Sequence, residues 1–203
     1  MFKDVNCYLT RGHIYILQGP NGAGKSTFIE LLTGLHMGNY TGDIRYNGVS
    51  IERLDMYSLR KTAIGISEQE PNMIADSLWY NVSLTDTIPC RLPEALEALS
   101  QAMGLSSFIT TLAQGWQTPV NQEGVKLSGG EKQKLALLRT LLKDTDVMIF
   151  DEPTSALDKA STQAFRTYLT SIQQDKVILV ITHDSTFIQE EDHLIELTNP
   201  CPA

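Results

Sequence analysis

The sequence has no long apolar segment. No stretch approaches the roughly eighteen consecutive apolar residues of a membrane-spanning helix, and the strongest apolar run, Val177 to Ile181, has the length of one strand. The first residues, Met1 to Asp4, lack the basic-then-apolar order of a signal peptide. We therefore expect a cytoplasmic chain without direct membrane insertion, which reaches a membrane only through a partner.

Cysteine and positive charge are both scarce. Cys7, Cys90 and Cys201 have no metal-site spacing, and their odd, scattered count indicates free thiols in a reducing compartment. The 24 acidic residues outnumber the 16 basic ones, which gives a formal net charge of −8. An acidic surface repels phosphate backbones, so we expect no nucleic-acid partner. A local cradle for a single nucleotide is still compatible with this charge, because a few lysines and backbone N–H groups can form it.

Strand-like and helix-like segments alternate along the chain, whose 203 residues fit one domain with two lobes. The strand-like runs are 14–18, 44–46, 63–67, 147–150 and 177–182. Helical patterns cover 25–33, 93–103, 131–142 and 159–172. This alternation predicts an α/β fold with a mostly parallel sheet covered on both faces. Residues 71–142 lack a convincing strand, so we expect a helical lobe inserted into a core of residues 1–70 and 143–203.

The first motif that handles phosphate lies between an expected strand and an expected helix, and it has the pattern GxxxxGK[ST]. Its glycines let the backbone wrap closely around phosphate oxygens, and the N–H groups of the loop and helix form an anion site. We expect Lys25 against the β- and γ-phosphates and the Ser26 hydroxyl on Mg²⁺. The expected nucleotide-binding residues are Gly19, Pro20, Asn21, Gly22, Ala23, Gly24, Lys25, Ser26 and Thr27. By itself, this loop leaves kinase, GTPase and ATPase open.

A pair of acids, Asp151 and Glu152, follows the strand-like run 147–150. In phosphate-loop enzymes an acidic residue at such a strand end holds Mg²⁺, and a neighbouring carboxylate can orient or deprotonate the attacking water. Asp151 is therefore the expected metal ligand and Glu152 the expected catalytic base. Without the phosphate loop, two solvated acids would be the simpler explanation.

The segment Leu127-Ser128-Gly129-Gly130-Glu131 resembles the signature motif of ABC-type ATPases, and it precedes Asp151. From about Phe2 to Leu197, the chain is similar to the ATP-binding domain of ABC transporters. The resemblance implies a P-loop NTPase (RecA-like) core with an inserted helical subdomain. It also implies a second ATPase domain, identical or different, bound head-to-tail. In that arrangement the signature of one subunit covers the γ-phosphate held by the other, through Ser128, Gly129, Gly130 and Glu131.

Three further residues match family motifs in the family's order. Gln69 resembles the Q-loop glutamine, Asp158 lies in a segment that resembles the D-loop at the dimer seam, and His183 resembles the switch histidine. The resemblance implies ATP and Mg²⁺ as cofactors. It implies catalytic roles for Glu152, His183 and Gln69, and a Mg²⁺ site made by Ser26, Gln69 and Asp151.

Finer features resemble the exporter branch. Gln69-Glu70-Pro71 continues through Ser77 and Leu78 to Asn81, and the stretch from Pro119 to Gly124 precedes the signature, where exporters sense the coupling helices. Gln122 stands where the family usually has Glu. The implied function is an ATPase, peripheral at the inner face of a membrane, that drives transport, and specifically export, through a transmembrane transporter domain.

One departure concerns adenine. Family members carry an adenine-stacking aromatic residue well upstream of the phosphate loop, whereas only 18 residues precede Gly19 here, and neither Phe2 nor Tyr8 aligns with it. The expected consequence is weak, poorly base-selective nucleotide binding by this chain, or a chain that is a trimmed piece of a longer one, or a partner that supplies the ring. Two alternatives stay open: an ABC-type ATPase that acts outside transport, which the acidity disfavours, and a weakly hydrolysing regulatory subunit.

Overall fold

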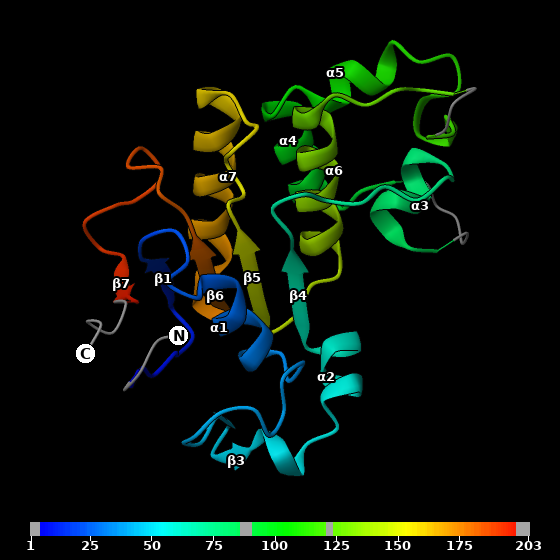
Figure 1. The fold of residues 1–203 in the computed structure, drawn as a ribbon. Coiled ribbons are helices and arrows are strands. Elements are labelled where there is room, and N and C mark those ends of the chain that lie inside the picture. The colour runs from blue at the N-terminus through cyan, green and yellow to red at the C-terminus, as the bar shows by residue number, and fades with distance from the viewer. Residues whose placement is uncertain (1–4, 86–90, 121–123, 198–203) are drawn as a thin grey trace.

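The computed structural model describes residues 5–85, 91–120 and 124–197, and a five-stranded sheet with the order β4-β5-β6-β1-β7 lies at its centre (Figure 1). Every pairing within this sheet is parallel, which confirms the predicted α/β fold with a mostly parallel sheet. The strands are β1 (His13–Gln18), β4 (Ile64–Ser67), β5 (Val147–Asp151), β6 (Val177–Ile181) and β7 (His193–Glu196).

Alternate residues of β1, β5 and β6 belong to two separate hydrophobic cores, because successive side chains of a strand point to opposite faces. On β1, Ile14 and Ile16 belong to one core, and Tyr15 and Leu17 belong to the other. The central strands are buried on both faces, and no residue from Ile178 to Ile181 has any exposed surface. Such continuous apolar strands are typical of parallel sheets covered by helices.

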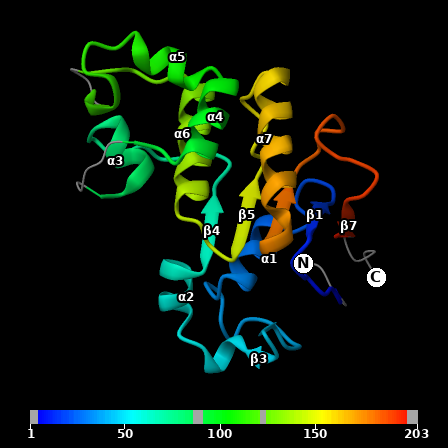
Figure 2. The same cartoon turned by 180° about the vertical axis from the view of Figure 1, so that it is seen from behind.

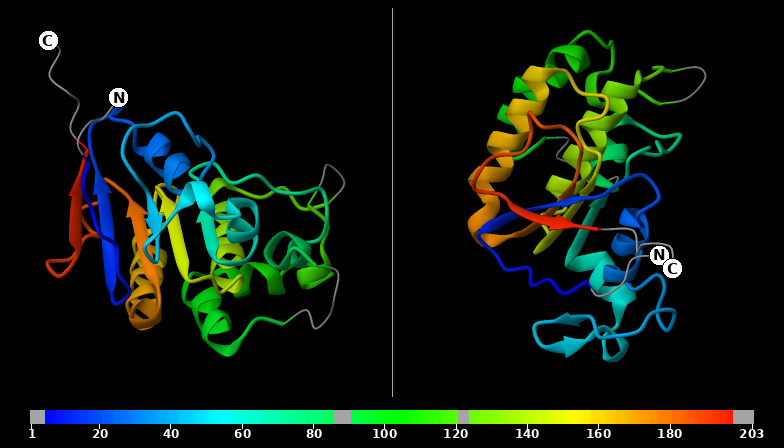
Figure 3. Two further views of the ribbon diagram at one scale, coloured as in Figure 1. Left: turned by 90° about the horizontal axis from the view of Figure 1, so that it is seen from below. Right: turned by 60° about the vertical axis from the view of Figure 1, so that its left-hand side comes forward.

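Helices cover both faces of the sheet (Figure 2). One core takes Phe28 and Ile29 from α1 (Lys25–Leu32) and Met56 from α2 (Met56–Thr62). The other takes apolar side chains from α6 (Gly129–Leu142) and α7 (Lys159–Ile172). The predicted helix over 159–172 agrees with α7 at both ends, and η3 (Gln173–Asp175) follows it. Seen from below, the sheet separates α1 and α2 from α7 (Figure 3).

A group of short helices lies beside α6, away from the sheet (Figure 1). Its members are α3 (Leu78–Ser83), α4 (Glu94–Ala102), α5 (Leu105–Thr110) and η2 (Gly115–Gln117). The fully buried Asn81 joins this group to the segment after β4, since its Nδ2 donates to the carbonyl oxygens of Ile74 at 2.9 Å and Ser77 at 3.0 Å. Arg139 of α6 donates in turn to the Asn81 carbonyl oxygen. Between residues 71 and 142, the described positions pair as strands only in one isolated bridge, Ser77 with Pro119.

The predicted strand over 44–46 is only partly right. It forms β2 (Arg45–Tyr46), which pairs antiparallel with β3 (Val49–Ser50) in a hairpin outside the main sheet. The turn between them, Asn47-Gly48, has φ of +50° and +80°, values typical of the tight turns that close two-residue hairpin loops. This hairpin, η1 (Ile51–Arg53) and α2 lie at the opposite end of the molecule from α5.

Candidate active site

The phosphate loop connects β1 to α1 at the carboxyl edge of the sheet. Gly22 and Gly24 have φ of +80° and +95°, a left-handed conformation that favours glycine. A Cβ on Gly19 would lie 2.6 Å from the carbonyl oxygen of Leu197, so no other residue fits there without movement. Gly24 caps α1 without a side-chain hydrogen bond. The first N–H groups of the helix therefore have no capping side chain and are available to an anion.

Lys25 folds back over this loop. Its Nζ donates to the carbonyl oxygens of Gly19 at 2.8 Å and Pro20 at 3.4 Å. The lysine is the first residue of α1, and Ser26 and Thr27 follow it in the first turn. A cation thus lies over the loop that leads into these N–H groups, an arrangement that suits a bound polyphosphate.

Two further acids and Lys25 act on Asp151 at the end of β5. Burial raises the pKa of the Asp151 carboxyl, the charges of Glu152 and Glu68 raise it further, and Lys25 lowers it. Glu68 was not among the predicted site residues, although its place next to Gln69, just after β4, could have indicated it. This edge of the sheet therefore carries an excess of negative charge, which a bound cation would offset.

Glu152 has an unusual backbone. Its φ of +45° is rare for a residue with a side chain, and its N–H donates to the carbonyl oxygen of Ile181 at 2.9 Å. Strained residues of this kind cluster at functional sites. Glu152 Oε1 lies 3.8 Å from His183 Nε2, and their side chains are 19% and 50% exposed. A partly exposed pair of a carboxylate and an imidazole can accept a proton from a water molecule that binds beside it.

The sheet order explains why these residues meet. Asp151 ends β5, His183 follows β6 by two residues, and the phosphate loop follows β1, so three adjacent parallel strands place them at one edge. Gln69 follows the outer strand β4 by two residues and is exposed. A hollow of about 490 Å³ lies elsewhere, over the β2–β3 hairpin, and contains none of the predicted residues.

The signature residues lie apart from this edge. Ser128 caps α6 in a capping box, in which Glu131 Oε2 accepts from Ser128 N at 2.7 Å and from Ser128 Oγ at 2.8 Å. The N-terminal end of α6 is at the top of the molecule in Figure 1, and the phosphate loop lies lower, between β1 and α1. Ser128 and Gly129 are exposed and Gly130 is partly buried. The single chain therefore does not bring its signature to its own phosphate loop.

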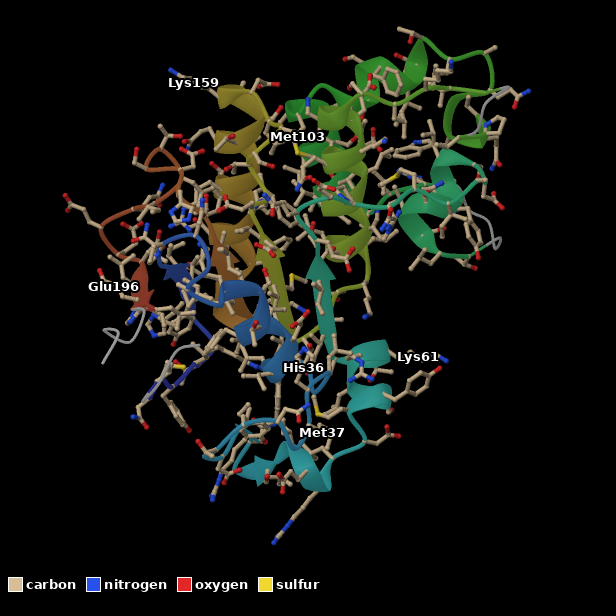
Figure 4. All side chains as sticks on the ribbon, in the orientation of Figure 1. His36, Met37, Lys61, Met103, Lys159 and Glu196 are labelled. Carbon is tan, nitrogen blue, oxygen red and sulfur yellow. The ribbon has the colours of Figure 1, made fainter. Side chains whose placement is uncertain are left out.

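Asp158 contacts α6, the helix that begins in the signature motif and is called the signature helix below. Asp158 caps α7 by accepting from Ser161 N at 2.8 Å, and its carboxylate lies 3.5 Å from Lys134 Nζ of α6. The Ser161 hydrogen bonds and the Lys134 charge lower the pKa of Asp158. Lys134 and Ser161 both donate to the carbonyl oxygen of Met103, beside the N-terminal end of α7 where Lys159 lies (Figure 4). A Cβ on Gly130 would meet the carbonyl oxygen of Ala156 at 2.9 Å.

The donor set proposed for Mg²⁺ has only one carboxylate. Within residues 5–85, 91–120 and 124–197, no cluster of three or more His, Cys, Asp or Glu side chains could hold a metal ion. The hydroxyl of Ser26, the amide of Gln69 and the Asp151 carboxylate are oxygen donors of the kind Mg²⁺ prefers when phosphate oxygens and water complete its shell. The charge excess around Asp151 agrees with such a cation.

Asp151→Asn should raise the thermal midpoint of the nucleotide-free chain at about pH 7. The folded-state pKa of Asp151 is raised, so the ionised carboxylate lowers the stability above the ordinary aspartate pKa of about 3.9 and has no effect well below it. The gain should therefore shrink as the pH falls toward about 4. Thermal unfolding at both pH values tests this, with Asp146→Asn, at an exposed aspartate, as control. A lower midpoint for Asp151→Asn at neutral pH would contradict it.

Some predicted features lie outside the described residues, namely Phe2, Cys90, Gln122 and Cys201. Tyr8 lies before β1 and is 86% exposed. None of the helices in the described ranges combines the length and the apolar character needed to cross a bilayer.

Comparison with known proteins places the chain in a family. The sequence profile of the ABC transporter family matches residues 2–155. The chain is 33% identical over 199 residues to the mouse ATP-binding cassette sub-family B member 6, covering 98% of this chain and 23% of that protein. It is 33% identical over 187 residues to the ATP-dependent lipid A-core flippase of Shewanella sp. (strain MR-4), covering 92% and 31%.

Solved structures agree. A bacterial Atm1-family ABC exporter with ATP bound matches with a TM-score of 0.81 at 32% identity, over 93% of this chain and 33% of that one. The chain thus spans about a third or less of the length of these relatives. This chain belongs to the ABC transporter family, and it is an ATP-binding domain of the exporter type.

Proposed function

We propose that this chain closes head-to-tail with a second ATPase domain around two ATP–Mg²⁺, and that hydrolysis drives export through a transmembrane partner. The separation of the signature from the phosphate loop carries the proposal. One chain assembles Lys25, Asp151, Glu152 and His183 at one edge, while Ser128 lies exposed at a distant helix end. A second chain turned head-to-tail would supply the missing signature to each nucleotide.

In this mechanism, Lys25 and the loop N–H groups bind the phosphates, and the glycines keep side chains out of their way. Mg²⁺, held by Ser26, Asp151 and Gln69, would offset charge on the phosphate oxygens. Glu152 takes a proton from the attacking water as its base. His183, 3.8 Å from Glu152, contacts the γ-phosphate and holds it against that water.

Loss of the γ-phosphate contacts then opens the dimer. A ligand shifts a conformational equilibrium only through a difference in its contacts with the two states, and ATP bridges two chains only when closed. The helical lobe, residues 71–142, would pass this movement to the transporter domain. The segment after β4 is tied to α6 through Asn81 and Arg139, so Gln69 and the signature helix would move together. The chain would act at the inner face of the membrane through this partner.

Complementation between two inactive variants tests the head-to-tail arrangement. Gly129→Asp suits the fold, because a Cβ at this position would lie 4.0 Å from the Cβ of Ala156, an ordinary contact, and an acid is favourable in a first helical turn. Its charge would repel the γ-phosphate of the second chain. Lys25→Ala removes the phosphate contact in its own chain. Each variant alone should lose most ATP turnover, and an equimolar mixture should regain part of it, because one site of the mixed dimer is intact.

Gly129→Ala is the matched control, since it adds the same Cβ without a charge and should keep most of its turnover. Phosphate release is measured for each variant and for the mixture. A mixture as inactive as its components, with both folded, would contradict the head-to-tail site. Copurification of the chain from detergent-solubilised membranes would then test the transporter partner separately.

A further inference from the structure

Arg166 of α7 is a fully buried charged side chain that no step above uses. It is 1% exposed and contributes to no predicted site. Its Nη2 donates to Asp192 Oδ1 at 2.8 Å and to Gln189 Oε1 at 2.9 Å, and the Arg166 and Asp192 side chains are 2% and 1% exposed. Its Nε and Nη1 have no hydrogen-bond partner within the described part of the chain. Apolar replacements of such pairs are often as stable or more stable, so stability alone explains this pair poorly.

Arg166 holds one particular segment, the irregular stretch 183–192 between β6 and β7. Its guanidinium lies 5.4 Å from the ring centroid of Phe187, which is fully buried. Asp192 is braced in turn, because its Oδ2 accepts from Gln189 N at 2.9 Å. One arginine on α7 therefore contacts the segment at Phe187, Gln189 and Asp192. We call Arg166, Gln189 and Asp192 the arginine clamp.

His183 lies at the start of this segment. On one side it is fixed by β6, where Ile181 accepts a hydrogen bond from Glu152 N at 2.9 Å. On the other side, Phe187 N donates to the carbonyl oxygen of Asp184 at 3.0 Å, which ties the residue after His183 to the clamped ring. The 3.8 Å separation of His183 from Glu152 thus depends on two anchors, and the clamp stabilises the second one.

We propose that Arg166 is a positioning residue, which acts through the arginine clamp to hold His183 beside Glu152. The inference rests on the proposed function, in which His183 contacts the γ-phosphate. Without the clamp, the segment after His183 would lose its contact with α7, while the phosphate loop, on the other face of the sheet with α1, would keep its contacts. Loss of the clamp should therefore lower the rate of hydrolysis and leave ATP binding unchanged.

The test uses Arg166→Met/Asp192→Asn, which removes both charges and leaves an amide oxygen for Gln189 N. Because no unpaired charge stays buried, the variant should unfold cooperatively near the wild-type temperature. Its kcat should fall roughly ten- to a hundred-fold, since a misplacement of about 1 Å can cost that much, while the KM for ATP stays within about twofold. Removal of Arg11–Asp146, an ion pair of the same 2.8 Å length with side chains 55% and 60% exposed, is the control and should change neither.

Histidine NMR gives a readout that does not need turnover. The imidazole signal of His183, assigned with His183→Ala, should shift or broaden in the double variant, while that of His36, after α1 in another part of the molecule, should not (Figure 4). Arg166→Lys repeats both measurements if the double variant fails to fold, because lysine cannot present the planar fork.

Three outcomes are distinguishable. Wild-type kcat together with an unchanged His183 signal in a folded variant would overturn the inference. A fall in kcat that only follows the fall in thermal stability from variant to variant would also overturn it, because that correlation indicates a purely structural residue. Absent turnover in the wild-type chain would count against the proposed function alone, and the NMR signal would still decide whether Arg166 positions His183.

Discussion

Glu152→Gln is expected to lower steady-state ATP hydrolysis by about 10²- to 10⁴-fold, the usual contribution of a positioned general base, while ATP still binds. Glutamine has the same size and can keep the backbone bond to Ile181, but its amide cannot take the proton of the attacking water. Because hydrolysis is what opens the proposed dimer, ATP should trap the variant as a closed pair. Phosphate release and light scattering with ATP measure the two effects.

Glu190→Gln is the control for this prediction, because Glu190 is exposed and takes part in none of the contacts described above. It should leave both turnover and oligomeric state unchanged. Wild-type turnover in Glu152→Gln would rule out Glu152 as the base, and Asp151 or an unassigned group would have to take that part. Loss of turnover without an ATP-dependent dimer would instead contradict the proposed closure.

Lys25→Ala is expected to weaken ATP binding by about 10- to 100-fold, because a hydrogen bond from a charged donor contributes about 1.5 to 3 kcal/mol. Lysine Nζ now binds the Gly19 carbonyl oxygen at 2.8 Å and would exchange this contact for phosphate oxygens. The positive φ values of Gly22 and Gly24 do not depend on the lysine, so the fold should persist. Calorimetric titration with ATP measures the affinity.

Lys61→Ala controls for the loss of one positive charge, because Lys61 lies exposed on α2, outside the site (Figure 4). Its affinity for ATP should match the wild type within about twofold, since an exposed charge outside the site is largely screened. An affinity of Lys25→Ala close to that of wild type would show that the loop N–H groups alone hold the phosphates. The assignment of Lys25 would then be wrong, even though its place in the motif is correct.

The parts of the fold that were predicted are those with a strong local signal. Strands β4, β5 and β6 are buried on both faces and read as apolar runs, and α7 has apolar residues at helical spacing. Strand β7 was missed because it lies at the sheet edge, where Leu194 is 54% exposed and polar residues flank it. The run 44–46 has strand character, but the Asn47-Gly48 turn pairs it with the next strand in a local hairpin, outside the main sheet.

The candidate site divides in the same way. Motif spacing identified the phosphate loop, because its glycines have a local conformational reason to be there. The approach of Glu68 to Asp151 and the 3.8 Å contact of His183 with Glu152 depend on which strands are neighbours, and no local pattern contains the strand order. The Arg166–Asp192 pair is 26 residues apart in sequence and joins elements that only the tertiary fold brings together.

The contact of Gly130 with Ala156 and the approach of Lys134 to Asp158 have a thermodynamic consequence. They join the N-terminal half of α6 to the five residues that follow Pro153, just after the proposed base. If a nucleotide on a neighbouring chain changes the free energy of α6, linkage requires that a nucleotide held beside Glu152 changes the affinity of the neighbour's site by the same factor. Two ATP molecules in such a pair would then bind with reciprocal cooperativity. The size of that cooperativity would measure how rigidly α6 is joined to residues 154–158.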